Sequence, residues 1–128
     1  MIVTSISPWL QVHNSVNAVE FYKTGFGAVE TYHQDIPDGS VVARLAINGA
    51  EFWLSEESRQ LETDPMVTDS CSIRMILTVP DPDSLFARAL EAGATQVYAI
   101  GEGHGWRIGR LVDPFGHHWE IGHPLDES

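Results

Sequence analysis

The stretch DPFGHHWEIGH, residues Asp113–His123, decides the fold of this chain. It opens with a turn, because Pro114 presets φ for the second turn position and Gly116 accepts any positive φ that the turn requires. The residues after the turn alternate as in a β-strand. One face of this strand would carry His118, Glu120 and Gly122, and the other Trp119 and Ile121.

Glu120 is the first candidate functional residue. A carboxylate in the middle of a strand beside aromatic rings is costly to bury unless it is paired or bound. The ordinary alternative is a strand glutamate that faces water. A second feature of the chain is needed to separate the two interpretations.

The composition predicts one globular domain over residues 1–128, with 43% hydrophobic and 20% charged residues. The formal net charge of −11 argues against nucleic acid and anionic membranes as partners. The same charge suits a well-solvated protein, or one that binds a cationic small molecule.

Cys71 is the only cysteine, so no intramolecular disulfide and no cysteine-based zinc motif is expected. The N-terminus lacks the basic and long apolar regions of a signal peptide. No apolar run approaches the roughly 20 residues that span a bilayer. These features predict a cytoplasmic protein.

The first half of the chain reads as strand, helix and three strands. Pro8 marks the first strand as irregular, and Asn14 or Ser15 can cap the helix, which stops at Gly25–Gly27. The expected strands of this half are residues 2–12, 28–35, 41–47 and 51–55. A polar connecting loop is expected over residues 56–70.

The second half repeats that order. Its helix opens at Asp81 and stops at Gly93, and the glycine-rich residues 101–105 are expected to form a mobile rim rather than a phosphate loop. The expected strands are residues 71–79, 94–100, 106–112 and 117–122.

The repeat has a nearly constant spacing. Gly27 and Gly93 end the two helices, and the hairpin glycines Gly49 and Gly116 are separated by almost the same length of chain. The fold class is therefore α+β, with two βαβββ modules at about residues 1–62 and 70–123.

The two modules, with the segments AVEFYKTGFGA, RALEAGA and DPFGHHWEI, resemble the vicinal oxygen chelate superfamily of glyoxalase I, bleomycin-resistance proteins, extradiol dioxygenases and fosfomycin-resistance enzymes. The DPFGHxW turn is most similar to the PhnB-like branch. The resemblance implies a cupped, eight-stranded mixed sheet around a cleft, and one such fold hosts many activities.

The resemblance also implies four metal-ligand positions, on the first and last strand of each module. In this sequence they hold Ser7, Trp53, Arg74 and Glu120. Only Glu120 is a plausible ligand, since Trp and Arg do not bind divalent cations and a serine hydroxyl is a poor ligand for Zn²⁺ or Ni²⁺. Lewis-acid catalysis usually needs three protein ligands or more. No cofactor is therefore expected.

A metal site made of Glu120, His118 and His13 is an alternative. His118 shares the strand face of Glu120, and His13 ends the first strand. The competing interpretation is that the histidines are scattered over the surface, and we favour it.

The tryptophans suggest a binding cleft instead. Trp9 and Trp53 fall on the face that carries the ligand positions of the first module, and apolar walls with a few polar groups are typical of small-molecule sites. A core position is the alternative for both, and it is equally favoured for Trp9. The predicted cleft residues are Ser7, Trp9, Gln11, Trp53, Arg74 and Glu120.

The sequence therefore predicts a metal-free small-molecule-binding protein of the glyoxalase/bleomycin-resistance type, with Arg74 and Glu120 paired where relatives hold a metal. The alternatives are a metal-dependent lyase or isomerase that uses Glu120 and histidines, and a scaffold without a ligand. Open sheet edges and an apolar concave face predict a homodimer. Pairing of modules within one chain and between two chains both remain open.

Overall fold

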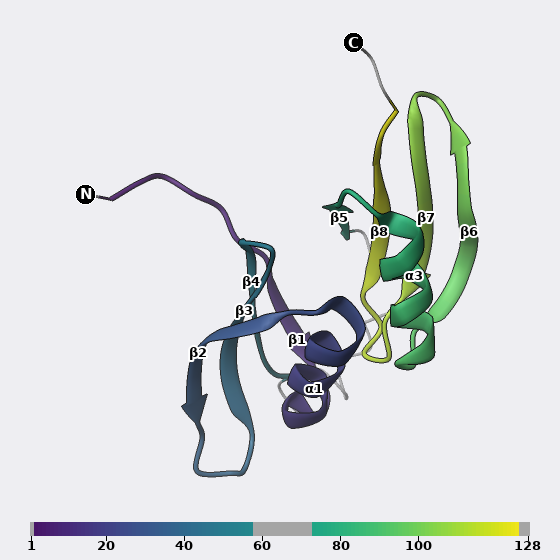
Figure 1. The fold of residues 1–128 in the computed structure, drawn as a ribbon. Coiled ribbons are helices and arrows are strands. Elements are labelled where there is room, and N and C mark those ends of the chain that lie inside the picture. Colours follow the sequence, from purple (N-terminus) through teal and green to yellow (C-terminus); the bar gives the residue numbers. More distant parts are fainter. Residues whose placement is uncertain (1, 58–72, 126–128) are drawn as a thin grey trace.

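The computed structural model describes residues 2–57 and 73–125, and within them it shows two βαβββ modules (Figure 1). Cys71 and most of the predicted connecting loop lie outside the described residues. The first module contains β1 (Trp9–Val12), α1 (Ser15–Phe26), β2 (Val29–Asp35), β3 (Val41–Ile47) and β4 (Ala50–Glu56). The second contains β5 (Arg74–Thr78), α3 (Pro82–Glu91), β6 (Thr95–Gly103), β7 (Trp106–Val112) and β8 (His118–Pro124).

Each module forms its own four-stranded mixed sheet. The strand order is β1-β4-β3-β2 in the first sheet, here sheet A, and β5-β8-β7-β6 in the second, sheet B. The first and last strands of each module pair in parallel, whereas the hairpin strands pair antiparallel. The predicted two-module fold is confirmed, and its eight strands divide equally between the two sheets.

The two helices begin and end where the sequence places caps. Asn14 caps α1 by accepting a hydrogen bond from the amide of Asn17, and Gly27 ends the helix at a φ of 70°. Asp81 caps α3 by accepting one from the amide of Ser84. The capping is local, which is why sequence alone locates these helices.

Three expected boundaries were wrong. Residues 2–8 are not part of a strand, because β1 pairs only with β4 and its register begins at Trp9 opposite Trp53. The expected rim at 101–105 is mostly sheet, since Gly101, Glu102 and Gly103 pair with β7 and leave only a tight turn at positions 104 and 105. β8 likewise continues to Pro124, so that His123 belongs to the strand.

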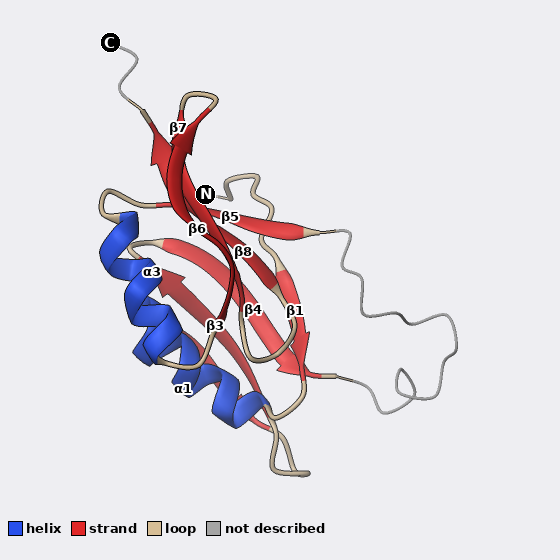
Figure 2. Cartoon of the chain, turned by 90° about the vertical axis from the view of Figure 1, so that its right-hand side faces the viewer, coloured by secondary structure: helices blue, strands red, loops and turns tan. Residues whose placement is uncertain are grey.

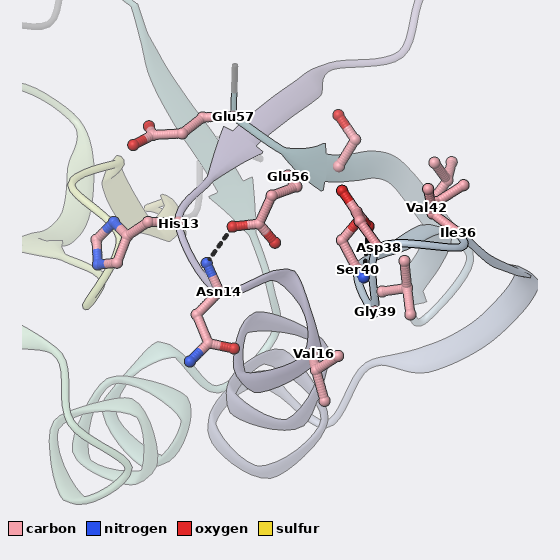
Figure 3. Close-up of a pocket in the computed structure, with 12 residues that line it drawn as sticks. His13, Asn14, Val16, Ile36, Asp38, Gly39, Ser40, Val42, Glu56 and Glu57 are labelled. Carbon is pink, nitrogen blue, oxygen red and sulfur yellow. Dashed lines mark hydrogen bonds between the residues drawn. The ribbon is translucent and has the colours of Figure 1, made fainter. Parts of the chain in front are cut away.

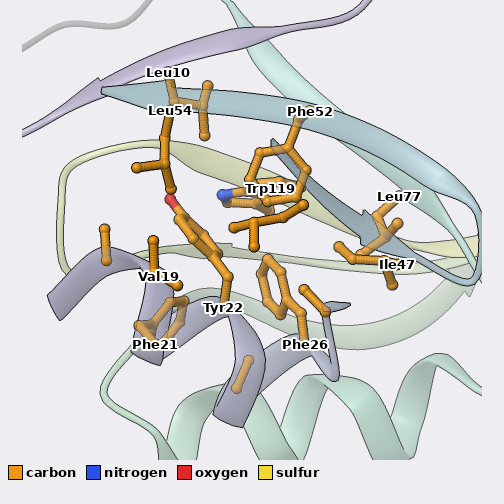
Figure 4. Close-up of a cluster of buried hydrophobic side chains, with 14 of the residues drawn as sticks. Leu10, Val19, Phe21, Tyr22, Phe26, Ile47, Phe52, Leu54, Leu77 and Trp119 are labelled. Atoms are coloured by element: carbon orange, nitrogen blue, oxygen red, sulfur yellow. The ribbon is translucent and has the colours of Figure 1, made fainter. Parts of the chain in front are cut away.

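The core lies between the inner faces of the two sheets and the two helices, which lie side by side along one flank of the sheets (Figure 2). Trp119 of β8 is central: its ring lies 5.4 Å from that of Phe52 on β4 and 4.8 Å from that of Phe26 on α1 (Figure 4). The buried core of both modules includes Leu10, Val12, Tyr22, Phe26, Leu45, Phe52, Leu54, Leu111, Trp119 and Ile121. No helix of the described residues is long and apolar enough to cross a bilayer.

Asp113, in the turn before β8, ties the modules together. It is 3% exposed and accepts hydrogen bonds from the Tyr22 hydroxyl at 2.5 Å and from the Trp119 indole nitrogen at 2.9 Å. It also accepts from the backbone amides of Phe115 and His117. Burial, and then the neighbouring carboxylate, raise the pKa of Tyr22. This network holds α1 of the first module to β8 of the second.

Candidate functional site

The two sheets present their outer faces in opposite directions. Phe52 and Trp119 touch between the sheets, so the inner faces of β4 and β8 face each other. Side chains alternate along a strand, and the neighbours Trp53 and Glu120 therefore lie on the outward faces. The candidate site is divided between these two outer faces.

An aromatic shelf covers the outer face of sheet A. Trp9 and Trp53 are register partners on β1 and β4, and their rings stack 5.3 Å apart with planes only 6° from parallel. Tyr32 extends the shelf at 5.6 Å from Trp53, and the Arg44 guanidinium lies 5.2 Å from the centre of the Trp53 ring. Trp9 donates a hydrogen bond to the Ser55 hydroxyl and is still 53% exposed. Trp9 is thus a surface residue, and the core alternative for it was wrong.

An ion pair occupies the corresponding place on sheet B. Arg74 Nε donates to Glu120 Oε2 at 2.7 Å, and the Tyr98 hydroxyl lies 3.5 Å from the same oxygen. The side chain of Arg74 is 50% exposed and that of Glu120 is 12% exposed. The carboxylate is therefore mostly withdrawn from water and has the charged partner that burial demands. The predicted contact between these two side chains is present.

The structure brings the six predicted cleft residues together only in part. Trp9 joins Trp53, and Arg74 joins Glu120, whereas the two pairs lie on faces that point apart within one chain. Gln11 is exposed on the face of Trp9, and Ser7 is exposed before β1 begins.

The four implied ligand positions do not fit a divalent metal. Their only carboxylate, Glu120, already accepts a hydrogen bond from Arg74. Tryptophan, arginine and a serine outside the strand supply no replacement ligands.

The alternative histidine site does not form either. His118 Nδ1 accepts a hydrogen bond from Arg110, and the ring of His13 packs 5.6 Å from that of Phe115. Within the described residues, no three His, Cys, Asp or Glu side chains are placed to hold a metal ion.

The sequence analysis did not identify four further residues on the outer faces of the two sheets. Tyr32 and Arg44 are register partners on sheet A, and Tyr98 and Arg110 are register partners on sheet B. The signal was in the repeat, because the tyrosine and the arginine are equally spaced in the two modules. The register of the sheets places Arg44 opposite Trp53 and Arg110 opposite Glu120, so each Tyr–Arg pair lies beside one of these two residues.

A cavity of about 850 Å³ lies elsewhere, between the N-terminus of α1 and the β2–β3 turn (Figure 3). Its lining combines acidic side chains, among them Asp38 and Glu56, with aliphatic ones such as Val16. Glu56 accepts hydrogen bonds from the amides of Asn14 and Ser15 and from the Ser15 hydroxyl, at 2.7 to 2.8 Å. Burial opposes ionisation of Glu56, but these hydrogen bonds outweigh it and lower its pKa. The carboxylate thus caps α1, and this cavity contains none of the six predicted cleft residues.

Comparisons with known proteins agree with this architecture. A family model described as a glyoxalase-like domain matches residues 9–122. The uncharacterized protein Mb0911c of Mycobacterium bovis is 39% identical over 130 residues, which cover 96% of this chain and 85% of the relative. The uncharacterized protein At5g48480 of Arabidopsis thaliana is 28% identical over 80% of this chain and 68% of its own length.

Solved structures show the same fold. The X-ray structure of the At5g48480 gene product superposes with a TM-score of 0.65 at 25% identity, covering 94% of this chain and 98% of the other. The fosfomycin resistance protein FosX of Listeria monocytogenes gives a TM-score of 0.75 at 17% identity, covering 99% of this chain and 98% of the other. At that identity the likeness concerns the fold alone. From the family match over residues 9–122 and the repeated βαβββ modules, the chain belongs to the glyoxalase-like domain family of the vicinal oxygen chelate superfamily.

Proposed function

We propose that this protein binds a small molecule in a cleft formed between two copies of the chain, without a metal ion. In this arrangement the outer face of sheet A from one copy lies opposite the outer face of sheet B from the other. The aromatic shelf of Trp9 and Trp53 then faces the Arg74–Glu120 pair. One wall is apolar and the other carries a few fixed polar groups, as in most small-molecule sites.

The Trp9–Trp53 stack, in which Trp9 is exposed and Trp53 is half-buried, is the observation that carries this proposal. Large aromatic rings that are stacked and left facing water usually mark an interaction surface. Sheet B has exposed apolar side chains on its outer face as well, among them Ile76 and Tyr98. Both β1 and β5 are edge strands of their sheets within the described residues. Unpaired edges beside exposed apolar faces favour association with a second copy.

The metal-dependent lyase or isomerase remains the weaker alternative. It requires Glu120 to leave Arg74 and His118 to leave Arg110, and each change breaks an existing hydrogen bond.

The finer assignment to the PhnB-like branch rests on the DPFGHxW turn of the sequence. It remains part of the proposal.

Light scattering tests the association. We expect a mass near twice the 14.2 kDa of one chain at micromolar concentration. An Ile76→Arg substitution, which places a charge on the exposed face of sheet B, should shift the protein toward the monomer. A wild-type monomer at that concentration would contradict the shared cleft.

Calorimetric titration with 1-naphthamide, a neutral planar probe, tests the binding. We expect saturable binding that Trp53→Ala weakens at least tenfold. Val16→Ala is the control, because Val16 lines the acidic cavity and not the aromatic shelf. Greater loss in the Val16 variant than in the Trp53 variant would place the ligand in that cavity and reject the proposed cleft.

Thermal unfolding with added Ni²⁺, Zn²⁺ or Mn²⁺ separates the two functions. An ion that binds only the folded protein raises the free energy of unfolding by RT ln(1 + [L]/Kd), where [L] is the free ion concentration. We expect no stabilisation that depends on Glu120. A rise in Tm at modest metal excess that disappears in Glu120→Gln would favour the metal-dependent enzyme.

A further inference from the structure

The two modules each carry a Tyr–Arg pair on the outer face of the sheet. Tyr32 lies opposite Arg44 on sheet A, and Tyr98 lies opposite Arg110 on sheet B. Arg44 is in turn the register partner of Trp53, and Arg110 is that of Glu120. Both guanidinium groups therefore stand beside the proposed cleft at equivalent places.

The positive charge of Arg44 has a carboxylate and an aromatic ring beside it. Its guanidinium lies over the Trp53 ring at 5.2 Å, its Nε donates to Thr31 Oγ1 at 2.9 Å, and Glu51 lies 3.6 Å from the same nitrogen. A carboxylate and an aromatic face thus already balance this positive charge.

Arg110 differs, because nothing in the described part of the chain balances its charge. Its Nε donates to His118 Nδ1 at 3.2 Å, and no carboxylate of the described residues lies within ion-pair distance. The two terminal nitrogens make no hydrogen bond within residues 2–57 and 73–125. Since no buried side-chain nitrogen there lacks a partner, these nitrogens reach solvent.

The nearest acidic side chain on this face does not offset that charge. Glu120 is the strand neighbour of Arg110, but its carboxylate is bound by Arg74 at 2.7 Å. The face of sheet B around Arg110 is therefore locally positive, although the whole chain has a net charge of −11. The residues that make the net charge negative lie mostly outside this face, so the net charge does not predict the charge of the ligand.

We propose that the ligand of this cleft is a planar aromatic acid whose carboxylate binds Arg110. The proposal rests on the shared cleft described under the proposed function, and it adds the chemical class of the ligand. The terminal nitrogens of an arginine match the two oxygens of a carboxylate in a bidentate pair. The aromatic ring of the same ligand stacks on Trp9 and Trp53 of the opposite copy.

A cationic ligand is disfavoured by the same geometry. It would meet the unbalanced charge of Arg110 on the wall formed by sheet B. Like charges in a partly dry cleft repel, and the carboxylates beside this site, Glu120 and Glu51, already lie next to Arg74 and Arg44.

Three probes of one shape test the charge preference: 1-naphthoate, neutral 1-naphthamide and cationic 1-naphthylmethylammonium. Calorimetric titration of the wild-type protein should show that naphthoate binds at least tenfold more tightly than naphthamide, with the cation weakest. The advantage of naphthoate should shrink as sodium chloride is raised, because salt screens an exposed charge.

Arg110→Met should remove the advantage of naphthoate over naphthamide, and Arg110→Lys should keep part of it. Arg107→Met is the matched control on the same strand. Arg107 faces the opposite way and binds Asp83 at 2.6 Å, so its loss removes one positive charge without changing the cleft. The naphthoate advantage should survive in this control.

The outcomes separate the two proposals. If all three probes bind equally and Trp53→Ala weakens all of them, the cleft stands and the aromatic acid is rejected. Tighter binding of the cation, or an advantage of naphthoate that survives Arg110→Met, also rejects the acid. If no probe binds and none responds to Trp53→Ala, the proposed cleft itself fails. If Arg110→Met lowers Tm, the aromatic acid is tested by the other two measurements. These are the loss of the naphthoate advantage at high salt in the wild type and its partial retention in Arg110→Lys.

Discussion

The two modules of this chain have the same strand order and equivalent pairing of their first and last strands but different outer faces. The row that crosses sheet A holds Trp9 and Trp53, and the equivalent row of sheet B holds Ile76 and Glu120. One face is an aromatic shelf and the other is centred on an ion pair. The inner faces, by contrast, are apolar in both modules because they share one core. The comparison shows that the repeat preserves the fold while leaving the outer faces to diverge.

The largest effect is expected at the final turn, where the modules differ most. The first module closes with a short turn at Asn48 and Gly49, whereas the second buries Asp113. Asp113→Ala strands the Tyr22 hydroxyl, the Trp119 indole and two amides, and should reduce the free energy of unfolding by about 3–5 kcal/mol. Urea denaturation measures this. Asp38→Ala, in an exposed turn, should cost under about 1 kcal/mol, and equal losses would show that Asp113 is not the tie between the modules.

The helix N-termini give the next contrast. Both helices have a cap of their own, Asn14 for α1 and Asp81 for α3. In addition, Glu56 of β4 accepts three hydrogen bonds at the start of α1. Charge-assisted hydrogen bonds are the stronger kind, so Glu56→Gln should cost about 1–3 kcal/mol and Asp81→Ala about 1 kcal/mol.

The Glu56 contribution should also depend on pH. The pKa of Glu56 is lowered in the folded protein, so its contribution is present above the unfolded-state pKa, near the usual 4.5. The contribution is lost as the pH falls through the lower folded-state pKa. Urea denaturation between pH 7 and pH 3 should show a smaller acid-induced loss in Glu56→Gln than in the wild type. Parallel curves for the two proteins would refute this role.

The ion pair of sheet B should show coupling. Arg74→Leu leaves the Glu120 carboxylate mostly buried without its partner, so it should destabilise by about 1–2 kcal/mol, reduced from the fully buried case because Arg74 is half exposed. The double variant Arg74→Leu/Glu120→Leu should be more stable than the single one. A double-mutant cycle by thermal unfolding measures the difference, and a coupling energy of zero would mean that the pair contributes nothing.

The smallest effect concerns an exposed histidine present only in the first module. His33 lies 2.5 Å from Glu30 and 2.8 Å from Asp35, and hydrogen bonds to these carboxylates, Glu30 first, raise its pKa. A raised folded-state pKa means that any stabilisation is present below the usual 6.5 and is lost as pH rises through the folded value. NMR titration should show the pKa of His33 falling toward its usual value in Glu30→Gln. His104, outside this cluster, is the reference, and an unchanged His33 titration would count against the pairing.

Much of the fold could be predicted because its signals are local. The glycines Gly27 and Gly93, the Asp81 cap and the alternation from His118 to Gly122 each reflect backbone constraints within a few residues. The same patterns misplaced the ends of β1 and β6. The ladder between β1 and β4 begins only at Trp9 and Trp53, although β4 itself begins at Ala50, and the ladder between β6 and β7 continues to Gly103. Such limits are set by pairing between strands and not by a local pattern.

The candidate site was less predictable, because it depends on which residues face which way. The ligand positions implied by the superfamily resemblance placed Arg74 against Glu120, and the structure has that contact. Tyr98 and Arg110 were missed although the repeat spaces them as it spaces Tyr32 and Arg44, because only the register of the strands shows that each Tyr lies beside its Arg.

The sequence by itself determined that this chain builds two βαβββ modules, and that the ligand positions of its superfamily hold a tryptophan, an arginine and a single carboxylate. Local backbone preferences are enough for the first conclusion, and the second rests on the resemblance to the superfamily together with the chemistry of the residues at the implied positions. Only the tertiary structure decided that the aromatic shelf and the Arg74–Glu120 pair point away from each other within one chain. That orientation follows from packing Phe52 against Trp119 in a shared core, a contact between residues of different modules that no local pattern specifies.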